Sequence, residues 1–333
     1  MRKKIEVVVA GGGPAGAVTA LCLARRGFRV GLFEASNFDN DRYGETLPPE
    51  MNPVLRELGL WDAFARLGSV EAPGIVSVWG STSPSQQDFI SNVHGCGWHI
   101  DRNRFDAMIC REAVAAGAVL HPGCAARPEA GDAQLLVDAS GRAGLRLDAE
   151  HTYRRDDMLL AIALRLKGAP GTDLRTTIET TPQGWWYTAP IPDGQTMAMF
   201  FTDPDIYATE GIVVGEQLEH APLTRARLAP CGIVTSRVLH VPSACRAKMF
   251  GEGWIAVGDS ASAYDPLSGR GIYKAFRHGM AAAGAIAEGT HTEYAARVTH
   301  EFDEYVPQRR MYYASERRWP DSAFWRKRIG NQA

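Results

Sequence analysis

Short, fully apolar runs alternate with segments of helical periodicity at the start of the chain. An apolar run from Ile5 to Ala10 precedes apolar positions spaced as in a helix from Ala15 to Arg26, and a second short run follows at 29–33. Strands buried on both faces form continuous apolar runs, whereas amphipathic helices repeat about every 3.6 residues. The beginning of the chain therefore predicts a strand, a helix and a second strand.

The pattern is different between about residue 151 and residue 244. Alternating or β-rich runs occur at 158–166, 176–180 and 196–202, with turn signals at 192–194 and 203–205. Such runs predict a second, mostly antiparallel sheet. The remaining segments predict a buried strand and several helices, at 134–139 for the strand and at 52–58, 102–116 (with Asp101 as N-cap), 271–288 and 292–318 for the helices.

A glycine motif follows the first predicted strand. Gly11, Gly13 and Gly16 surround the start of the first helix, which Ala15 opens, and Glu34 ends the second strand. In this context the glycines allow a tight turn, close approach of a pyrophosphate and packing of the helix on its strand, while the helix N-terminus attracts phosphate. An acidic residue at the end of the second strand binds ribose hydroxyls and repels a 2′-phosphate. The segment therefore predicts a dinucleotide site that does not take NADP.

A second segment far downstream complements the first. Gly258 and Asp259 follow the apolar run 254–257, and the next loop leads to a helix that begins near 269–271. A carboxylate at the end of this strand is suited to accept hydrogen bonds from a ribityl chain. Together the two segments predict that the dinucleotide is FAD.

Composition and charge narrow the class of protein. The chain has 333 residues, of which 45% are hydrophobic and 22% charged, and its formal net charge is −2. This charge predicts no electrostatic affinity for nucleic acid or for an anionic membrane. The six cysteines form no CxxC pair, and no apolar run approaches transmembrane length, so we expect no metal site and a cytoplasmic protein.

The motifs, taken in order, resemble those of the para-hydroxybenzoate-hydroxylase-type flavoprotein superfamily. This superfamily includes aromatic hydroxylases, flavin-dependent halogenases and geranylgeranyl-reductase-like enzymes. The segments that carry the resemblance are 11–16, 138–142, 258–259 and 265–271. Finer features at 44–49, 77–81, 97–102, 184–192 and 318–325 are similar to the LodB-like branch, whose members modify tryptophan residues of a partner polypeptide during biogenesis of tryptophylquinone cofactors.

The resemblance implies a fold and a domain order. It implies an α/β protein with a Rossmann-type FAD-binding domain, interleaved with a mostly antiparallel β substrate domain and followed by C-terminal helices. The FAD-binding domain is expected at 1–70, 95–150 and 245–290, the substrate domain at 71–94 and 151–244, and the C-terminal helical segment at 291–333. The stretch 121–138 is short for the superfamily, which predicts a more open approach to the flavin.

The resemblance also assigns roles to individual residues. Arg102 is expected to contact the cofactor, and Gly269, Gly271 and Ile272 to place a helix N-terminus near flavin N1 and C2=O, where reduced flavin is negatively charged. Pro266 is expected near the reactive edge of the flavin, although a turn-stiffening role is the alternative.

Two further residues are candidates for the catalytic site. His99 lies in a family-like motif and is a candidate for proton transfer. Trp185 is a candidate for the wall of an aromatic substrate pocket, with ordinary core packing as the alternative.

The implied function is that of an FAD-dependent monooxygenase that uses O2 to hydroxylate an aromatic ring, specifically a tryptophan side chain of a partner polypeptide. NAD(P)H or a separate flavin reductase would supply electrons, because the chain has no second GxGxxG motif. A small-molecule aromatic hydroxylase, a geranylgeranyl-reductase-like enzyme and a halogenase are the alternatives. Halogenases of this type place a catalytic lysine after the GET-like segment, but this chain has no lysine between Lys4 and Lys167.

Overall fold

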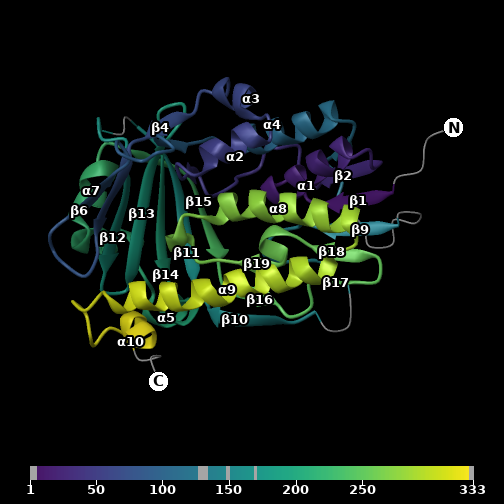
Figure 1. Cartoon of the computed structure of the whole chain (residues 1–333). Coiled ribbons are helices and arrows are strands. Elements are labelled where there is room, and N and C mark those ends of the chain that lie inside the picture. Colours follow the sequence, from purple (N-terminus) through teal and green to yellow (C-terminus); the bar gives the residue numbers. More distant parts are fainter. Residues whose placement is uncertain (1–5, 127–133, 148–150, 169–170, 330–333) are drawn as a thin grey trace.

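Figure 1 shows the computed structural model, which describes residues 6–126, 134–147, 151–168 and 171–329. An α/β part lies on the right of the view and a taller sheet on the left, with helix α9 (His291–Ala314) along the lower side of both. This arrangement confirms the predicted fold class. The predicted domain boundaries stay a prediction.

The sheet of the α/β part has six strands. Its centre, β1 (Val7–Ala10), is wholly buried and pairs in parallel with β2 and β9, as continuous apolar runs predict. The strands follow in the order β17 (Phe250–Gly251), β18 (Trp254–Ala256), β9 (Leu135–Asp138), β1, β2 (Val30–Glu34) and β8 (Val119–Pro122).

Three helices pack together on this sheet. They are α1 (Pro14–Arg25), α4 (Arg102–Ala115) and α8 (Gly271–Glu288), with α1 in contact with both others. The predicted N-cap of α4 is confirmed, because the Asp101 side chain accepts a hydrogen bond from the N–H of Arg104.

The strand order defines a place for a ligand. From β1 the chain crosses through α1 to β2 on one side, whereas β9 pairs with β1 on the other side. In open α/β sheets ligands bind beyond the carboxyl ends of the strands, where the strand order reverses. Here that place lies between Gly11, which follows β1, and Ala139, which follows β9.

The second large sheet has seven strands and is mostly antiparallel, as predicted. Only the pair of β12 and β5 is parallel. The order is β15 (Gly232–His240), β11 (Leu160–Lys167), β14 (Gln195–Thr202), β13 (Gly184–Ile191), β12 (Thr176–Thr181), β5 (Gly74–Val78) and β6 (Ser85–Asp88).

Side chains alternate between the two faces of this sheet. Trp185 and Phe201 belong to a core cluster with Tyr313 of α9 and with Trp325 of α10 (Ala323–Ile329), whereas the neighbouring Trp186 belongs to a separate cluster with α7 (Pro222–Leu228). The period of two along a strand explains the division. The sheet therefore separates one face toward α9 and α10 from another toward α7.

Two small sheets connect these parts. One contains β10 (Tyr153–Asp157), β16 (Ser243–Arg246) and β19 (Ser262–Ala263), and the other β3 (Thr46–Leu47), β7 (Gly97–His99) and β4 (Val70–Ala72). Helices α2 (Met51–Glu57) and α3 (Trp61–Ala65) follow β3.

The segment 203–205, predicted as a turn, instead begins a helix. Helix α5 (Pro204–Glu210) has Pro204 at its first turn and Asp205 beside it, and both residue types favour a helix N-terminus. The β-rich pattern of 151–244 also missed the short helices α6 (Val214–Gln217) and α7. Tertiary packing against the sheet stabilises such short helices more than local propensity does.

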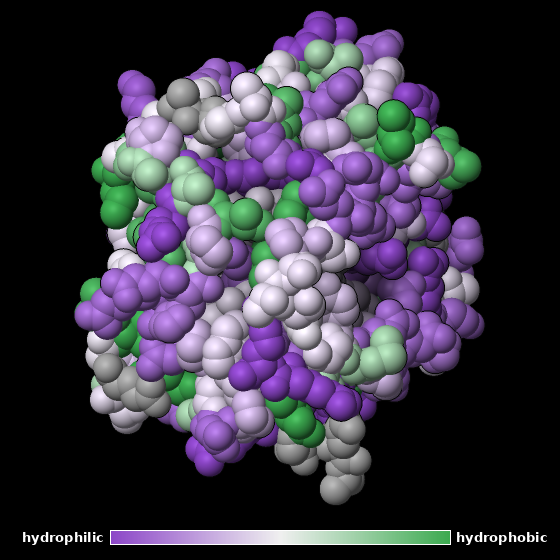
Figure 2. Space-filling model, turned by 90° about the vertical axis from the view of Figure 1, so that its left-hand side faces the viewer, coloured by the Kyte–Doolittle hydropathy of each residue, from purple (hydrophilic) through white to green (hydrophobic). Residues whose placement is uncertain are grey.

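The surface beside β6 and α7 is of mixed hydropathy. Figure 2 views the molecule from this side, where hydrophobic groups are scattered in small patches among hydrophilic ones. No helix in the described part of the chain is long and apolar enough to cross a membrane. Residues 127–133 of the short stretch noted above lie outside the described residues.

Candidate active site

The glycine turn after β1 is as tight as the motif predicts. Gly11 has a φ of +114°, and a Cβ there would lie 2.3 Å from the carbonyl oxygen of Ala139. A Cβ on Gly16 would lie 2.0 Å from the carbonyl oxygen of Gly11. Both positions therefore exclude any side chain, because the turn packs directly on the residue after β9 and on the first turn of α1.

The N-terminus of α1 is open toward the same place. Its N-cap, Gly13, makes no side-chain capping bond, the first turn has no acidic residue, and a Cβ on Gly13 would meet nothing within 4 Å. Ala15, in the first turn, is buried. Unpaired N–H groups and the helix dipole favour a phosphate at such a terminus, so the residues present fit the pyrophosphate of a dinucleotide.

Glu34 is held at the end of β2. It accepts hydrogen bonds from the N–H groups of Gly12 (2.8 Å) and Ser36 (2.9 Å), and Arg42 lies 2.8 Å from it. Burial acts to raise the pKa of Glu34, but the Ser36 N–H and the Arg42 guanidinium outweigh burial and lower it. The residue is therefore a fixed negative charge beside α1, as the ribose-binding prediction requires.

The downstream segment returns to this helix. A Cβ on Gly258 would lie 2.5 Å from the Cβ of Ala15, so the two predicted cofactor segments are in contact. Asp259 pairs with Lys274 of α8 (2.9 Å) and with Arg142 (3.4 Å). Although burial acts to raise the pKa of Asp259, these two cations lower it.

Sequence reasoning missed both cations. Lys274 lies on the buried face of a largely apolar helix, and this placement was the available signal. Its ammonium also contacts the carbonyl oxygen of Ser262 and lies 4.7 Å from the ring centre of Tyr264. Arg142 belongs to the segment 138–142, which contributes to the family resemblance.

The loop before α8 ends in an open helix N-terminus. Pro266 begins a short 3-10 turn, Gly269 adopts a left-handed conformation (φ +60°), and α8 begins at Gly271 with no side-chain cap. A Cβ on either glycine would meet nothing within 4 Å, whereas Ile272 is buried. This terminus can therefore receive a negatively charged group, as predicted.

Arg102 is fixed by contacts on two sides. Its guanidinium donates to Asp106 (3.0 and 3.2 Å) and to the carbonyl oxygen of Tyr43. Arg42 also donates to Asp106 (2.7 Å), so one buried carboxylate holds two arginines. The Arg102 guanidinium is therefore held within the protein, and the contact of Arg102 with a cofactor stays a prediction.

Glu45 is a buried carboxylate that lies next in the chain to the Tyr43–Gly44 contact. It is 1% exposed, and neither carboxylate oxygen has a hydrogen-bond partner among the residues that the structure describes. Burial raises the pKa of Glu45 to about 7, with Arg102 and Arg165 opposing the shift. Sequence reasoning used this residue only as part of a motif.

We expect the Glu45→Gln variant to lose one component of the pH dependence of stability. Because the pKa is raised from 4.5 to about 7 on folding, the native state binds more protons than the unfolded state between these values. The contribution of Glu45 to the free energy of unfolding is fully present below its unfolded-state pKa and is lost as the pH rises through its native-state pKa. The free energy of unfolding of the variant, minus that of the wild type, should therefore increase by about 2 to 3 kcal/mol from about pH 5 to about pH 8. Urea unfolding at both pH values measures this gain, and parallel pH profiles would contradict it.

His99 is enclosed in the protein interior. It is wholly buried, Nδ1 lies 3.1 Å from the Thr46 hydroxyl, and Nε2 lies 2.8 Å from the Leu174 carbonyl oxygen. Burial lowers the pKa of His99 to about 4. Both ring nitrogens are engaged, so the geometry gives no support to the predicted proton transfer.

Trp185 likewise lies in the core. It is 1% exposed, stacks on Phe201 with 4.0 Å between ring centres, and donates its indole N–H to the Tyr313 hydroxyl (3.0 Å). This arrangement corresponds to the core-packing alternative. Tyr313 in turn donates to Asp265 (2.9 Å), which precedes Pro266, so hydrogen bonds link Trp185 to the loop before α8 through Tyr313.

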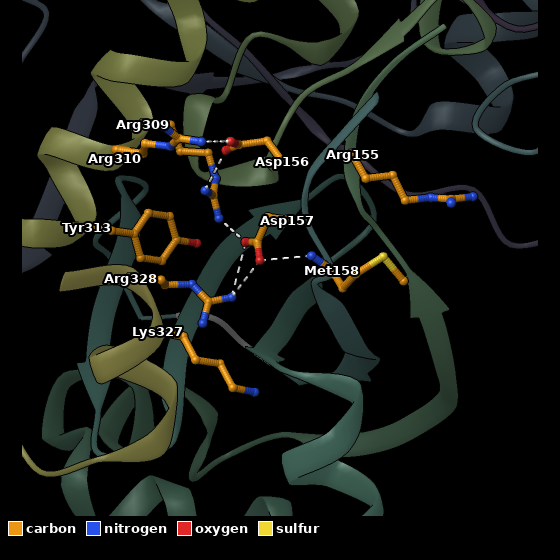
Figure 3. Close-up of a pocket in the computed structure, with 9 residues that line it drawn as sticks. All are labelled: Arg155, Asp156, Asp157, Met158, Arg309, Arg310, Tyr313, Lys327 and Arg328. Atoms are coloured by element: carbon orange, nitrogen blue, oxygen red, sulfur yellow. Dashed lines mark hydrogen bonds and ion pairs between the residues drawn. The ribbon is translucent and has the colours of Figure 1, made fainter. Parts of the chain in front are cut away.

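A cavity of about 290 Å³ lies between α9, α10 and the end of β10 (Figure 3). Its charged groups bind one another: Asp156 pairs with Arg309 and Arg310, and Asp157 with Arg309 and Arg328. Arg309 also donates to Asp265 (2.9 Å). The cavity is therefore lined by a structural ion-pair network that anchors the loop before α8. The described residues include no group of three histidine, cysteine or acidic side chains placed to hold a metal ion.

Comparison with known proteins agrees with this geometry. Residues 4–143 match the family model described as FAD binding domain. The FAD-dependent oxidoreductase LodB of Marinomonas mediterranea is 28% identical over 97% of this chain and 96% of its own length. A tryptophan 2-halogenase of Chondromyces crocatus is 27% identical over 84% of this chain and 60% of its own length.

Solved structures show the same fold. The flavin-dependent halogenase CmlS has a TM-score of 0.84 at 22% identity, covering 98% of this chain and 68% of CmlS. The peptidyl tryptophan dihydroxylase QhpG, described as essential for tryptophylquinone cofactor biogenesis, has a TM-score of 0.73 at 22% identity, covering 98% of this chain and 79% of QhpG. The FAD-binding match and the named relatives support an FAD-dependent oxidoreductase. The chain fits the FAD-dependent monooxygenase superfamily, which the motifs indicated.

Proposed function

We propose that the chain is a monooxygenase that adds oxygen to a tryptophan side chain of a partner polypeptide. We prefer oxygen transfer to halogenation because of Lys274, the lysine beside the cofactor segments. Lys274 is buried and held by Asp259 and Ser262, and burial lowers its pKa despite Asp259. An ammonium held in this way is not available to direct a halogenating species.

The residues around the cofactor segments have separate tasks in this proposal. The α1 N-terminus at Gly13 would hold the pyrophosphate, Glu34 the adenosine ribose and Asp259 the ribityl chain. The open N-terminus of α8 at Gly271 would stabilise negative charge on the flavin ring. FAD, when bound, supplies the activation of O2, with electrons from NAD(P)H or a separate flavin reductase.

The names of similar proteins support a polypeptide substrate. QhpG is described as acting on peptidyl tryptophan, and a brominase of Pseudoalteromonas luteoviolacea, 27% identical over 86% of this chain, is described as acting on a pyrrole carbonyl group carried by a peptidyl carrier protein. In each case the reacting ring is attached to a macromolecule. Remote contacts with a macromolecule can supply binding energy used at the reacting ring.

Halogenation of a tryptophan or another ring is the second candidate. It is favoured by the descriptions of several similar proteins as halogenases, among them the tryptophan 2-halogenase. The two candidates share the cofactor site and differ in the group that is transferred.

The test of the proposal compares a polypeptide with free aromatic compounds. The FAD-loaded chain is supplied with NADH, a flavin reductase and air, and is given either the polypeptide encoded by the neighbouring gene or free tryptophan. We expect oxygen on a tryptophan of the polypeptide and a value of kcat/KM for free tryptophan at least about a hundredfold lower. Efficient oxygenation of a free indole or phenol with an unmodified polypeptide would favour a small-molecule hydroxylase.

A further inference from the structure

The strand β15 forms a long, uncovered edge of the seven-stranded sheet. It spans nine residues and, among the described strands, pairs with β11 alone. Ile233 is 64% exposed, Val234 56% and Val238 46%. A long, exposed strand edge with apolar side chains is a template for pairing with another chain, and proteins usually shorten, charge or cover it.

The register identifies which backbone groups are free. The N–H of Val241 donates to the carbonyl oxygen of Leu159 (2.8 Å), and His240 faces Leu160 in the antiparallel pair. Hydrogen-bonded and non-hydrogen-bonded pairs alternate along such a pair. Residues 235, 237 and 239 therefore bond to β11, whereas Ser236, Val238 and His240 direct their N–H and C=O groups outward. No described strand pairs with this outward row.

The edge lies on the side of the sheet that is turned toward the α/β part, as the order of strand labels from β6 to β15 shows (Figure 1). Arg237 of β15 and Arg165 of β11 are diagonal neighbours, opposite Ala163 and Thr235, and lie on the same face as Leu239. Tyr43 packs against the same core cluster as Leu239. This is the face next to the segment 41–46, which contacts Arg102.

The charge at this edge is unbalanced in favour of the cations. Arg237 lies 3.9 Å and Arg165 3.8 Å from the same carboxylate, Asp41. Two guanidinium groups therefore share one acidic partner, and Arg237 is 68% exposed. The exposed edge is complementary to an acidic segment.

We propose that an acidic, extended segment of the target polypeptide docks on β15 as an additional strand. The inference rests on the proposed function, because it assigns a docking surface to that polypeptide substrate. An added strand would lie about 4.8 Å beyond β15, and every second side chain would project on the face of Arg237 and Tyr43. A tryptophan at such a position is directed to the side where the cofactor segments lie.

The first measurement is amide hydrogen exchange of the FAD-loaded chain, read at single residues. Adding the polypeptide encoded by the neighbouring gene should slow exchange at Ser236, Val238 and His240 at least about tenfold, because new hydrogen bonds protect these groups. The inward N–H groups of 235, 237 and 239 serve as the internal control, since β11 already protects them. Unchanged exchange at the outward groups would overturn the inference.

The second measurement uses variants of the edge. Val238→Pro removes an outward N–H, and proline is tolerated on edge strands, whereas Val238→Thr keeps this N–H and serves as the matched control. We expect the proline variant to raise KM for the polypeptide at least about tenfold, with FAD affinity and kcat near those of the wild type. Ser236→Pro should act in the same way, and Arg237→Glu should also raise KM.

These outcomes separate the inference from the proposed function. Normal KM in both proline variants, with a wild-type chain that oxygenates the polypeptide, would overturn the docking site and leave the function intact. If the wild-type chain leaves the polypeptide unmodified, the proposed function fails. In that case slower exchange of the outward N–H groups with the polypeptide present still supports docking on β15. Unchanged exchange of these groups overturns the docking site as well.

Discussion

Replacing Gly16 with alanine is expected to abolish FAD binding, because the new Cβ would lie 2.0 Å from the carbonyl oxygen of Gly11. Neither atom can move without opening the turn between β1 and α1. Gly13→Ala is the matched variant, since its Cβ meets nothing within 4 Å of the chain but enters the space in which we place the pyrophosphate. It should retain the stability of the wild type and weaken FAD binding at least about tenfold.

Isothermal titration with FAD and thermal unfolding of both variants measure these effects. The two variants separate packing from ligand contact, because the first should lower both stability and affinity and the second affinity alone. Wild-type FAD affinity in Gly13→Ala would show that the pyrophosphate does not lie at the N-terminus of α1.

The second large effect is expected at the buried pair of Asp138 and Arg246. These side chains lie 3.0 Å apart and are 0% and 1% exposed, and Asp138 also accepts from the N–H of Leu145. Asp138→Ala leaves a buried guanidinium without its partner, which typically costs about 3 to 5 kcal/mol of unfolding free energy. Urea unfolding measures the loss.

An exposed ion pair provides the control for this variant. Arg104 and Asp193 lie 2.8 Å apart with about half of each side chain exposed, so Arg104→Ala should change stability by less than about 1 kcal/mol. Equal losses in the two variants would contradict the role of burial.

Segments with strong local signals could be predicted from sequence. The helix that begins after the Gly11 turn and the helix that begins at Gly271 were both predicted, because glycine conformations and apolar periodicity are local properties. Helices α5 and α7 were not predicted, because their stability depends on packing against a sheet assembled from distant segments.

In the candidate site, too, local sequence predicts some residues, whereas their partners come from distant parts of the chain. The sequence predicts Glu34 and Asp259 as cofactor residues because one ends and the other closely follows an apolar strand. Their partners Arg42, Lys274 and Arg142 come from other segments. No local pattern predicts such pairs. Motif resemblance placed His99 and Trp185 in the catalytic site, whereas tertiary packing buries both side chains and engages their polar atoms.

The most direct test of the proposed function is the mass of the modified polypeptide. The FAD-loaded chain, a flavin reductase and NADH are incubated with the target polypeptide under ¹⁸O2 in the presence of bromide. We expect a tryptophan of the polypeptide to carry ¹⁸O and no bromine. The isotope pattern of bromine on that tryptophan, with no ¹⁸O incorporated, would contradict the account.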